Sequence, residues 1–205
     1  MGDIQLVSST IPPLHDTASS RSSGQHVSSI IRDLAIRSGH FKPDSNDVSD
    51  NHLTTSVRIQ LGNALEYAIA SMLARNYPDR YVQIGELEID GIIGTPDLYD
   101  TQDNAIEEIK LTWMSSRHDA ASSRLKHYWQ QLRAYCHMFG TNLGRLHIVH
   151  VNGAYAWLSR GSTNPSKSTN DDPQYRCWQQ TFTDTDLIRN WSILLKHGER
   201  MRVSE

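Results

Sequence analysis

The chain has 205 residues, of which 38% are hydrophobic and 21% are charged, and its formal net charge is −3. This length and composition predict one soluble globular domain with a sizeable core. The slightly negative charge argues against a protein that packages nucleic acid through a strongly basic surface, but it allows an enzyme whose acidic side chains bind metal ions.

The first third of the chain indicates an arm followed by two helices. Residues 1–25 are rich in Ser and contain two consecutive prolines, which predicts an N-terminal arm, and residues 26–205 are expected to form a single domain. A short helix is predicted within residues 26–39, where Gly39 stops it. A longer helix is predicted from about residue 55 to 76, because apolar residues recur at helical spacing. These residues are Val57, Leu61, Ala64, Leu65, Ala68, Met72 and Leu73.

The middle of the chain indicates strands and then another helix. Alternating or β-branched patterns predict strands at residues 81–90, 91–100 and 105–113. A helix is predicted from about residue 120 to 139, and Gly140 is a suitable C-cap. The apolar stripe of this helix contains Leu125, Trp129, Leu132, Cys136 and Phe139.

The C-terminal part indicates further strands and a last helix. Strands are predicted at residues 145–153 and 154–160, with an Asn-Gly turn between them. A loop (residues 161–173) and an edge strand (residues 174–182) follow, and Thr183 or Thr185 caps a helix that runs to about residue 200. The element order predicts an α/β fold with a mixed central sheet flanked by helices.

Three ionisable residues stand out in the middle strands. Asp97 lies on one predicted strand, and Glu108 and Lys110 lie on the next strand, two residues apart and therefore on the same face. Charged side chains on such an apolar strand are costly unless they are paired or bound to metal. The neighbouring Glu107 is expected to face the opposite side, exposed to solvent.

This arrangement matches the needs of phosphodiester hydrolysis. Carboxylate oxygens are suitable ligands for Mg²⁺ or Mn²⁺, and a bound metal ion activates water and neutralises charge on the phosphate. A lysine nearby can position or deprotonate the attacking water, or stabilise developing negative charge. The sequence leaves the choice among these roles of Lys110 open.

The residues Pro96-Asp97 and Glu108-Ile109-Lys110 resemble the signature of the PD-(D/E)XK nuclease superfamily. Glu66 on the preceding helix and a Gln-x-x-x-Tyr pattern on the following helix, Gln131 to Tyr135, resemble the RecB-like and phage-exonuclease subgroup. The similarity runs from about residue 57 to 151, in the order that the family has. It implies a restriction-endonuclease-like core.

The resemblance also implies a role for each matching residue. Asp97 and Glu108 would be the main metal ligands, Glu66 would complete the metal shell, and the backbone carbonyl of Ile109 would add a ligand. Lys110 would be the catalytic lysine. Gln131 and Tyr135, which share a helix face, would line the active site as further catalytic residues.

Three residues are candidate DNA contacts. Arg124 lies on the same helix face as Gln131 and Tyr135, and Arg117 and His118 follow the lysine strand closely. The other histidines show no two-ligand metal spacing, so His147 and His150 are expected to be structural or surface residues. The two cysteines form no CxxC pair, which argues against a zinc site and against the iron–sulfur cluster that some relatives carry.

We therefore expect a metal-dependent deoxyribonuclease that acts on single- or double-stranded DNA, with ends as its expected substrate. The Gln-x-x-x-Tyr pattern favours an exonuclease of phage-type DNA recombination, replication or degradation. Two alternatives stay open: an endonuclease of the restriction or junction-resolving type, and a catalytically inactive nucleic-acid-binding module. No apolar run reaches membrane-spanning length and no signal-peptide pattern is present, so a cytoplasmic protein, phage- or virus-encoded by the resemblance, is expected. Digestion polarity and oligomeric state are left open.

Overall fold

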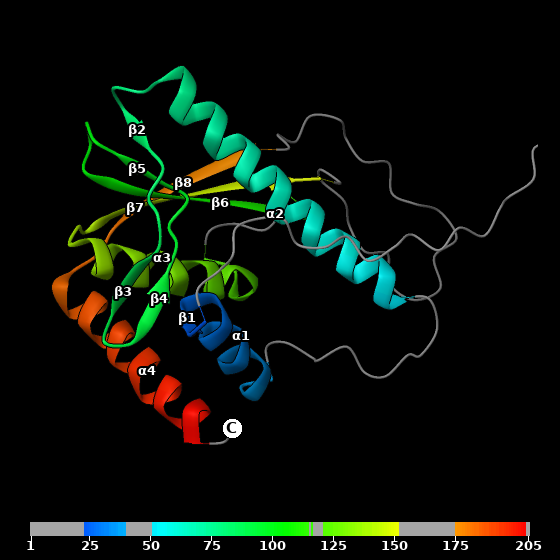
Figure 1. Cartoon of the computed structure of the whole chain (residues 1–205), viewed down its shortest axis with the longest axis vertical. Helices are drawn as coiled ribbons and strands as arrows, with labels where there is room; N and C mark the ends of the chain where they lie inside the picture. Colours follow the sequence, from blue (N-terminus) through cyan, green and yellow to red (C-terminus); the bar gives the residue numbers. More distant parts are fainter. Residues whose placement is uncertain (1–22, 40–50, 115, 117–120, 152–174, 204–205) are drawn as a thin grey trace, which may run out of the picture.

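The computed structural model describes residues 23–39, 51–114, 116, 121–151 and 175–203, with the backbone alone for residues 51–58 (Figure 1). A five-stranded sheet has the order β2-β5-β6-β7-β8, and a smaller sheet has the order β1-β4-β3. Within the described ranges, no helix is both long and apolar enough to cross a membrane. The strands are β1 (Gln25–His26), β2 (Tyr81–Val82), β3 (Leu87–Ile89), β4 (Ile92–Gly94), β5 (Leu98–Asp100), β6 (Ala105–Thr112), β7 (Leu143–His150) and β8 (Tyr175–Thr181). The helices are α1 (Val27–Arg37), α2 (Asn51–Asn76), η1 (Ser123–Leu125), α3 (Lys126–Phe139) and α4 (Asp184–Val203).

Helices cover both faces of the larger sheet. Ala70 of α2 packs on one face, against Leu98 and Ile109. Leu132 of α3 packs on the other face, in the main core with Ile106. β6 supplies both faces because successive side chains of a strand point in opposite directions. β6 and β7 are parallel, α3 connects them, and the remaining pairs in this sheet are antiparallel. The predicted mixed sheet flanked by helices is therefore confirmed.

The prediction of one strand at residues 81–90 and one at residues 91–100 is wrong in one respect. Each range forms two short strands, one in the larger sheet and one in the smaller sheet. β3 and β4 form a hairpin whose turn residues Asp90 and Gly91 have φ angles of 53° and 73°. Asp-Gly is a strong signal for such a turn. Pro96 has no backbone N–H to donate, so the chain leaves the small sheet after Gly94 and enters the large sheet at Leu98.

The predicted helices and the C-terminal edge strand are confirmed within the described residues. Gly140 ends α3 in the left-handed conformation, with a φ of 78°. β8 lies at the edge of the larger sheet. Thr183 caps α4, because its hydroxyl accepts the Asp186 N–H at 3.1 Å while the Asp186 carboxylate accepts the Thr183 N–H at 3.1 Å. The predicted strand at 154–160, its Asn-Gly turn and the loop at 161–173 lie outside the described residues, as do residues 1–22 of the predicted arm.

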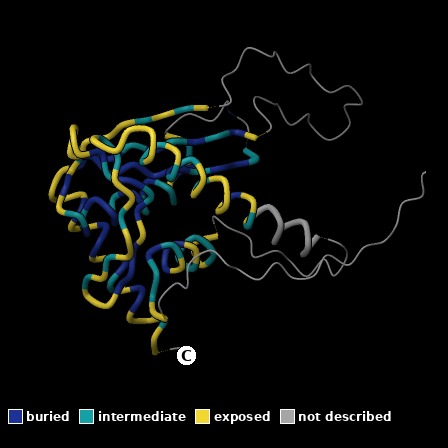
Figure 2. The backbone as a smooth tube through the Cα atoms, turned by 45° about the horizontal axis from the view of Figure 1, so that its top comes forward, coloured by how far each residue is buried: buried dark blue, intermediate teal, exposed yellow. Residues whose placement is uncertain are grey.

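Apart from Leu73, the described residues of the apolar stripe predicted for α2 do not lie on its buried side. Leu61, Leu65 and Met72 are 46%, 40% and 52% exposed, and Figure 2 shows exposed residues along the part of this helix that is coloured by burial. The helix packs on β6 and β2 through a different face, which contains Gly62, Glu66, Ile69, Ala70 and Leu73. The prediction failed because α2 carries apolar residues on two sides, so that spacing alone does not say which side faces the sheet.

The cap of α4 yields a stability prediction. Thr183→Ala should lower the free energy of unfolding by about 1 kcal/mol, because the Asp186 N–H loses its acceptor at the first turn of the helix. Thr183→Ser keeps the hydroxyl and should stay close to the wild type. Urea unfolding followed by circular dichroism measures both. Equal losses in the two variants would contradict a role of the cap.

Candidate active site

The candidate site lies where β5 ends and leaves one edge of β6 without a partner strand. The last β5–β6 pair joins Leu98 to Glu107. Beyond it, the Asp97 carboxylate accepts the N–H of Ile109 at 2.7 Å, and the Glu66 carboxylate accepts the N–H of Leu111 at 2.7 Å. These N–H groups are two residues apart and point to the same edge. Two carboxylates thus take the place of the missing strand, because buried backbone N–H groups need acceptors.

Glu108 and Lys110 alternate with these two N–H groups along the strand and project from the α3 face of β6. The Lys110 ammonium contacts Glu108 Oε1 at 2.6 Å and Glu66 Oε2 at 3.4 Å. Glu108 is buried, and its second oxygen, Oε2, has no hydrogen-bond partner among the described residues. The predicted proximity of Glu66, Glu108 and Lys110 is therefore seen directly, and Asp97 joins them through the backbone of β6.

Burial and mutual repulsion govern the charges of this group. Burial raises the pKa of Glu108 to about 8, since Lys110 offsets only part of the desolvation while Asp97 and Glu66 add to it. Burial also raises the pKa of Glu66, against the opposing effect of Lys110. Burial alone would lower the pKa of Lys110, but the three carboxylates outweigh it and raise that pKa. Negative charge is therefore in excess around one ammonium group.

The two residues of the Gln-x-x-x-Tyr pattern lie on α3 and contact each other. Gln131 Nε2 donates to the Tyr135 hydroxyl at 2.8 Å. Tyr135 is buried, and the charges of Glu108 and Lys110 both influence its pKa, which burial raises. Its ring packs closely on Gly94 of β4, where an added Cβ would lie 3.0 Å from Tyr135 Cε1. Gly94 therefore allows β4 to approach the helix that carries this pair.

A cleft of about 590 Å³ opens beside the site, between α1, the end of β6 and the start of α3. Arg124 lines it, together with Lys126 and His127. Burial lowers the pKa of His127 to about 4, so its ring is neutral near neutral pH. Tyr128 also lines the cleft, hydrogen-bonds to Thr112, and is influenced by the charge of Lys110. Arg117 and His118 lie outside the described residues.

The donor set suits a hard divalent cation. Carboxylates from Glu66, Asp97 and Glu108 meet around β6, and the unpaired Glu108 Oε2 is an oxygen that a cation could satisfy. Within the described ranges, no three side chains of metal-binding type already form a metal centre. Lys110 is the counter-ion of these carboxylates in this structure.

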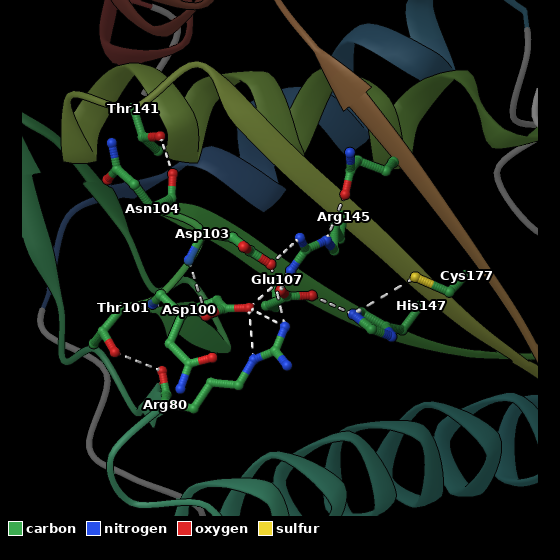
Figure 3. A network of polar contacts seen from close by, with 12 residues as sticks. Arg80, Asp100, Thr101, Asp103, Asn104, Glu107, Thr141, Arg145, His147 and Cys177 are labelled. Carbon is green, nitrogen blue, oxygen red and sulfur yellow. Dashed lines mark hydrogen bonds and ion pairs between the residues drawn. The ribbon is translucent and has the colours of Figure 1, made fainter.

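Glu107 was predicted to be exposed, and this prediction is wrong. Its side chain is 1% exposed and lies on the α2 face of the sheet. Arg145 of β7 contacts Glu107 at 2.7 Å and Asp100 at 2.8 Å, and Arg80 contacts Asp100 at 2.7 Å (Figure 3). The error has a physical reason. The face opposite Glu108 is covered by α2 and by basic side chains of neighbouring strands, so a carboxylate is paired there and not solvated.

The ionic cluster of Arg80, Asp100, Glu107, Arg145 and His147 joins strands β5, β6 and β7 to the turn before β2. Burial would raise the pKa of Asp100, but hydrogen bonds from Arg80 and Arg145 outweigh it and lower the pKa. Burial would likewise lower the pKa of His147, but contacts with Cys177 and Glu107 outweigh it and raise the pKa to about 9. His147 is thus a structural residue, which is one of the two roles expected for it. No pattern in the sequence indicated its partner, because Glu107 and His147 are far apart in the chain.

No family model matches this chain, and no curated protein matches it by sequence. Among solved structures it is similar to a phage-related exonuclease from Haemophilus somnus 129PT, with 17% identity and a TM-score of 0.48 over 84% of this chain and 79% of that chain. It is also similar to LHK-Exo in complex with dAMP, with 13% identity and a TM-score of 0.47 over 88% and 89% of the two chains. A second structure of LHK-Exo, an alkaline exonuclease from Laribacter hongkongensis, has 14% identity and a TM-score of 0.41 over 88% and 92%. Likenesses at values this low carry no weight for function, which rests on the site itself.

The ionic cluster yields a prediction on stability. Arg145→Met should lower the free energy of unfolding by about 3 kcal/mol, because the buried carboxylates of Glu107 and Asp100 each lose one basic partner and keep only His147 and Arg80, respectively. Chemical denaturation measures this loss. Arg37→Met is the matched control: Arg37 forms an exposed pair with Asp33, so its loss should cost less than about 1 kcal/mol. Similar losses in the two variants would contradict the structural role of Arg145.

His147 yields a prediction on pH dependence. Its pKa is raised from the ordinary value of 6.5 to about 9, so the stability it contributes is complete below about pH 6.5 and is lost as pH rises through 9. The free energy of unfolding of the wild type should exceed that of His147→Gln by roughly 1–3 kcal/mol near neutral pH. This difference should shrink toward zero above about pH 9. Urea unfolding of both proteins across this range measures it. A difference that does not change with pH would contradict the assignment.

Proposed function

We propose that this chain is a metal-dependent deoxyribonuclease, and in particular an exonuclease that hydrolyses phosphodiester bonds of DNA. One observation carries the proposal: the carboxylates of Glu66, Asp97 and Glu108 meet the ammonium of Lys110 at the free edge of β6, and one buried oxygen of Glu108 has no hydrogen-bond partner among the described residues. A purely structural ion pair would not need three carboxylates around one lysine.

The carboxylates supply the binding site for a divalent cation. Asp97 and Glu108 would be the main ligands for Mg²⁺ or Mn²⁺, with Glu66 and the backbone carbonyl of Ile109 completing the set. When bound, such an ion lowers the pKa of a coordinated water and neutralises charge on the scissile phosphate. The hydrogen bonds from Ile109 N–H and Leu111 N–H fix the orientation of the Asp97 and Glu66 carboxylates before any ion binds.

Lys110 and the Gln131–Tyr135 pair of α3 would act on the water and the phosphate that react. Lys110 carries its proton on Nζ while it contacts Glu66 and Glu108, and in this form it can donate a hydrogen bond to the attacking water or to a phosphate oxygen. Gln131 and Tyr135 form a hydrogen-bonded pair on the helix facing Glu108, and they would orient the lysine, the water or the DNA backbone.

The cleft beside the site offers the contacts that a DNA backbone requires. Arg124 and Lys126 line it, and cationic side chains of this kind commonly bind the phosphates of DNA. Arg124 is therefore the proposed phosphate contact among the described residues. Arg117 and His118 stay predictions from the sequence, as does a role in phage-type DNA recombination, replication or degradation.

An endonuclease on the same fold and an inactive DNA-binding module are the alternatives. The exonuclease proposal rests on the Gln131–Tyr135 pair, which follows from the sequence resemblance and is hydrogen-bonded in the structure. The inactive module is disfavoured because Glu66, Asp97, Glu108 and Lys110 are all present. Asp97 and Glu66 bind backbone N–H groups of β6, and Lys110 contacts Glu66 and Glu108.

The proposal predicts metal-dependent DNA degradation. With Mg²⁺ or Mn²⁺ the wild type should degrade end-labelled linear DNA, leave covalently closed circular DNA intact, and be inactive in EDTA. Lys110→Ala and Glu108→Gln should each reduce the rate by at least about 100-fold, because the first removes a cation that stabilises negative charge in the transition state and the second removes a charged ligand of the metal ion that does so. Gel analysis of labelled products measures both rates and shows the digestion polarity.

Glu88→Gln is the matched control, because it removes an exposed carboxylate on β3 outside the site and should leave the rate unchanged. Cleavage of closed circles would favour the endonuclease. DNA binding by folded protein without cleavage under any metal condition would favour the inactive module. Full activity in Lys110→Ala would overturn the assignment of the site.

A further inference from the structure

The cleft beside the candidate site has apolar walls, which a phosphate contact alone would not require. Helices α1, α3 and α4 pack on one another, and the cleft of about 590 Å³ opens between them and the end of β6. This volume lies within the roughly 300–1,000 Å³ that is usual for pockets that hold small organic groups. Much of the wall consists of the apolar residues Leu34, Ala35, Met114 and Ile193. Charged phosphate oxygens gain nothing from apolar contacts, so this wall fits another part of a ligand.

Two neighbouring rings extend the apolar wall. His127 and Tyr128 line the cleft, and their ring centroids lie 3.9 Å apart. Burial lowers the pKa of His127 to about 4, so its ring carries no charge near neutral pH. Rings of this kind are the usual platforms on which unpaired bases stack, whatever the base, because every base has a flat π-face.

The charge of the cleft is opposite to that of the acidic site beside it. Its cationic residues are Arg124 and Lys126, and both are exposed. Among the lining residues that the structure describes, there is no carboxylate. An anion with a flat apolar body therefore suits this cleft, and a metal ion does not. A nucleotide of a DNA strand is such an anion, because its phosphate can reach the cations while its base lies on the rings.

The cleft adjoins the candidate site through one face of β6. Lys110 belongs to the site, and Thr112, two residues further along the strand, projects from the same face and lines the cleft. Thr112 also hydrogen-bonds to Tyr128. Burial raises the pKa of Tyr128, and the charges of Lys110 and Glu66 act on it as well, so this side chain lies near both regions. A DNA strand with its scissile phosphate at the site would thus place a neighbouring nucleotide at the cleft.

We infer that this cleft binds one unpaired nucleotide of the DNA strand, so that the chain acts on single-stranded DNA. The base lies against the rings of His127 and Tyr128, and Arg124 contacts the phosphate. A base inside a duplex cannot bind in this way, because its faces are covered by its neighbours and only its edges are open in the grooves. The inference rests on the proposed nuclease function and adds the strand form of the substrate, which the acidic site alone does not select.

Binding without cleavage tests the pocket separately from the nuclease. In EDTA, fluorescence anisotropy compares a short thymidine strand with an abasic strand of equal length, which has the same backbone charge and no bases. Wild type should bind the thymidine strand about tenfold more tightly, because stacking of one base contributes roughly that factor. His127→Ala, which deletes a ring, and Ala35→Leu, which narrows the cleft, should each remove most of this preference. Arg124→Ala should weaken the binding of both strands alike, since Arg124 acts on the phosphate.

His137→Ala is the matched control for His127→Ala. His137 lies on the same helix, but its ring stacks on Trp191 and does not line the cleft, so its loss should leave the preference unchanged. Circular dichroism establishes that each variant is folded. Equal affinity of the wild type for the two strands, or no binding of either, would overturn the pocket. A preference that persists in both His127→Ala and Ala35→Leu would also overturn it.

A cleavage assay with Mn²⁺ keeps the two proposals apart. If both are correct, wild type degrades a single strand about tenfold faster than the same sequence in a blunt duplex, and His127→Ala reduces this ratio. Base-dependent binding without any cleavage would overturn the nuclease proposal and leave the pocket in place. Equal cleavage of single strand and blunt duplex, together with equal binding of the thymidine and abasic strands, would overturn the pocket and leave the nuclease in place.

Discussion

The unpaired edge of β6 is the constraint on which the candidate site depends. β5 pairs with β6 only as far as Glu107, and the N–H groups of Ile109 and Leu111 then need other acceptors. Carboxylates supply them, one from the residue just before β5 and one from α2. Because carboxylates repel each other, the strand also needs a cation at this position, and Lys110 provides it. The edge of β6 that has no partner strand therefore carries a cluster of acidic groups around one lysine.

The two faces of β6 carry different groups of charged residues, one at the candidate site and one that holds the strand in its register. Its α3 face carries Glu108 and Lys110, whereas its α2 face carries Glu107 in an ionic cluster with Arg145 and His147. The two faces belong to one strand, so a slip of register would exchange them. The buried partners of Glu107 therefore specify the register that directs Glu108 toward the site, although this requires several charges to be buried.

The sequence predicted the residues of the candidate site better than it predicted which side chains are buried. Glu66, Asp97, Glu108 and Lys110 were selected from the sequence, and the structure brings them together. Glu66, Glu108 and Lys110 lie on the expected elements, whereas Asp97 lies in the bend just before β5 and not on the strand predicted for it. The burial of Glu107 could not be predicted, because its partners Arg145 and His147 come from a strand that is distant in the chain. The exposed apolar residues Leu61, Leu65 and Met72 of α2 were assigned to the buried side for another reason. These residues have the same periodicity as a buried face, and only tertiary packing distinguishes the two sides of the helix.

The proposed chemistry depends above all on a divalent cation bound by the acidic cluster at the edge of β6. Electron paramagnetic resonance of Mn²⁺ titrated into the full chain, without DNA, measures this directly for wild type, Glu108→Gln and the surface control Glu88→Gln. We predict that wild type and Glu88→Gln bind Mn²⁺ alike, and that Glu108→Gln weakens binding by roughly tenfold or more, because it replaces a charged ligand with a neutral one. Equal binding by all three proteins, or no binding by the folded wild type, would contradict a cation site at this strand edge.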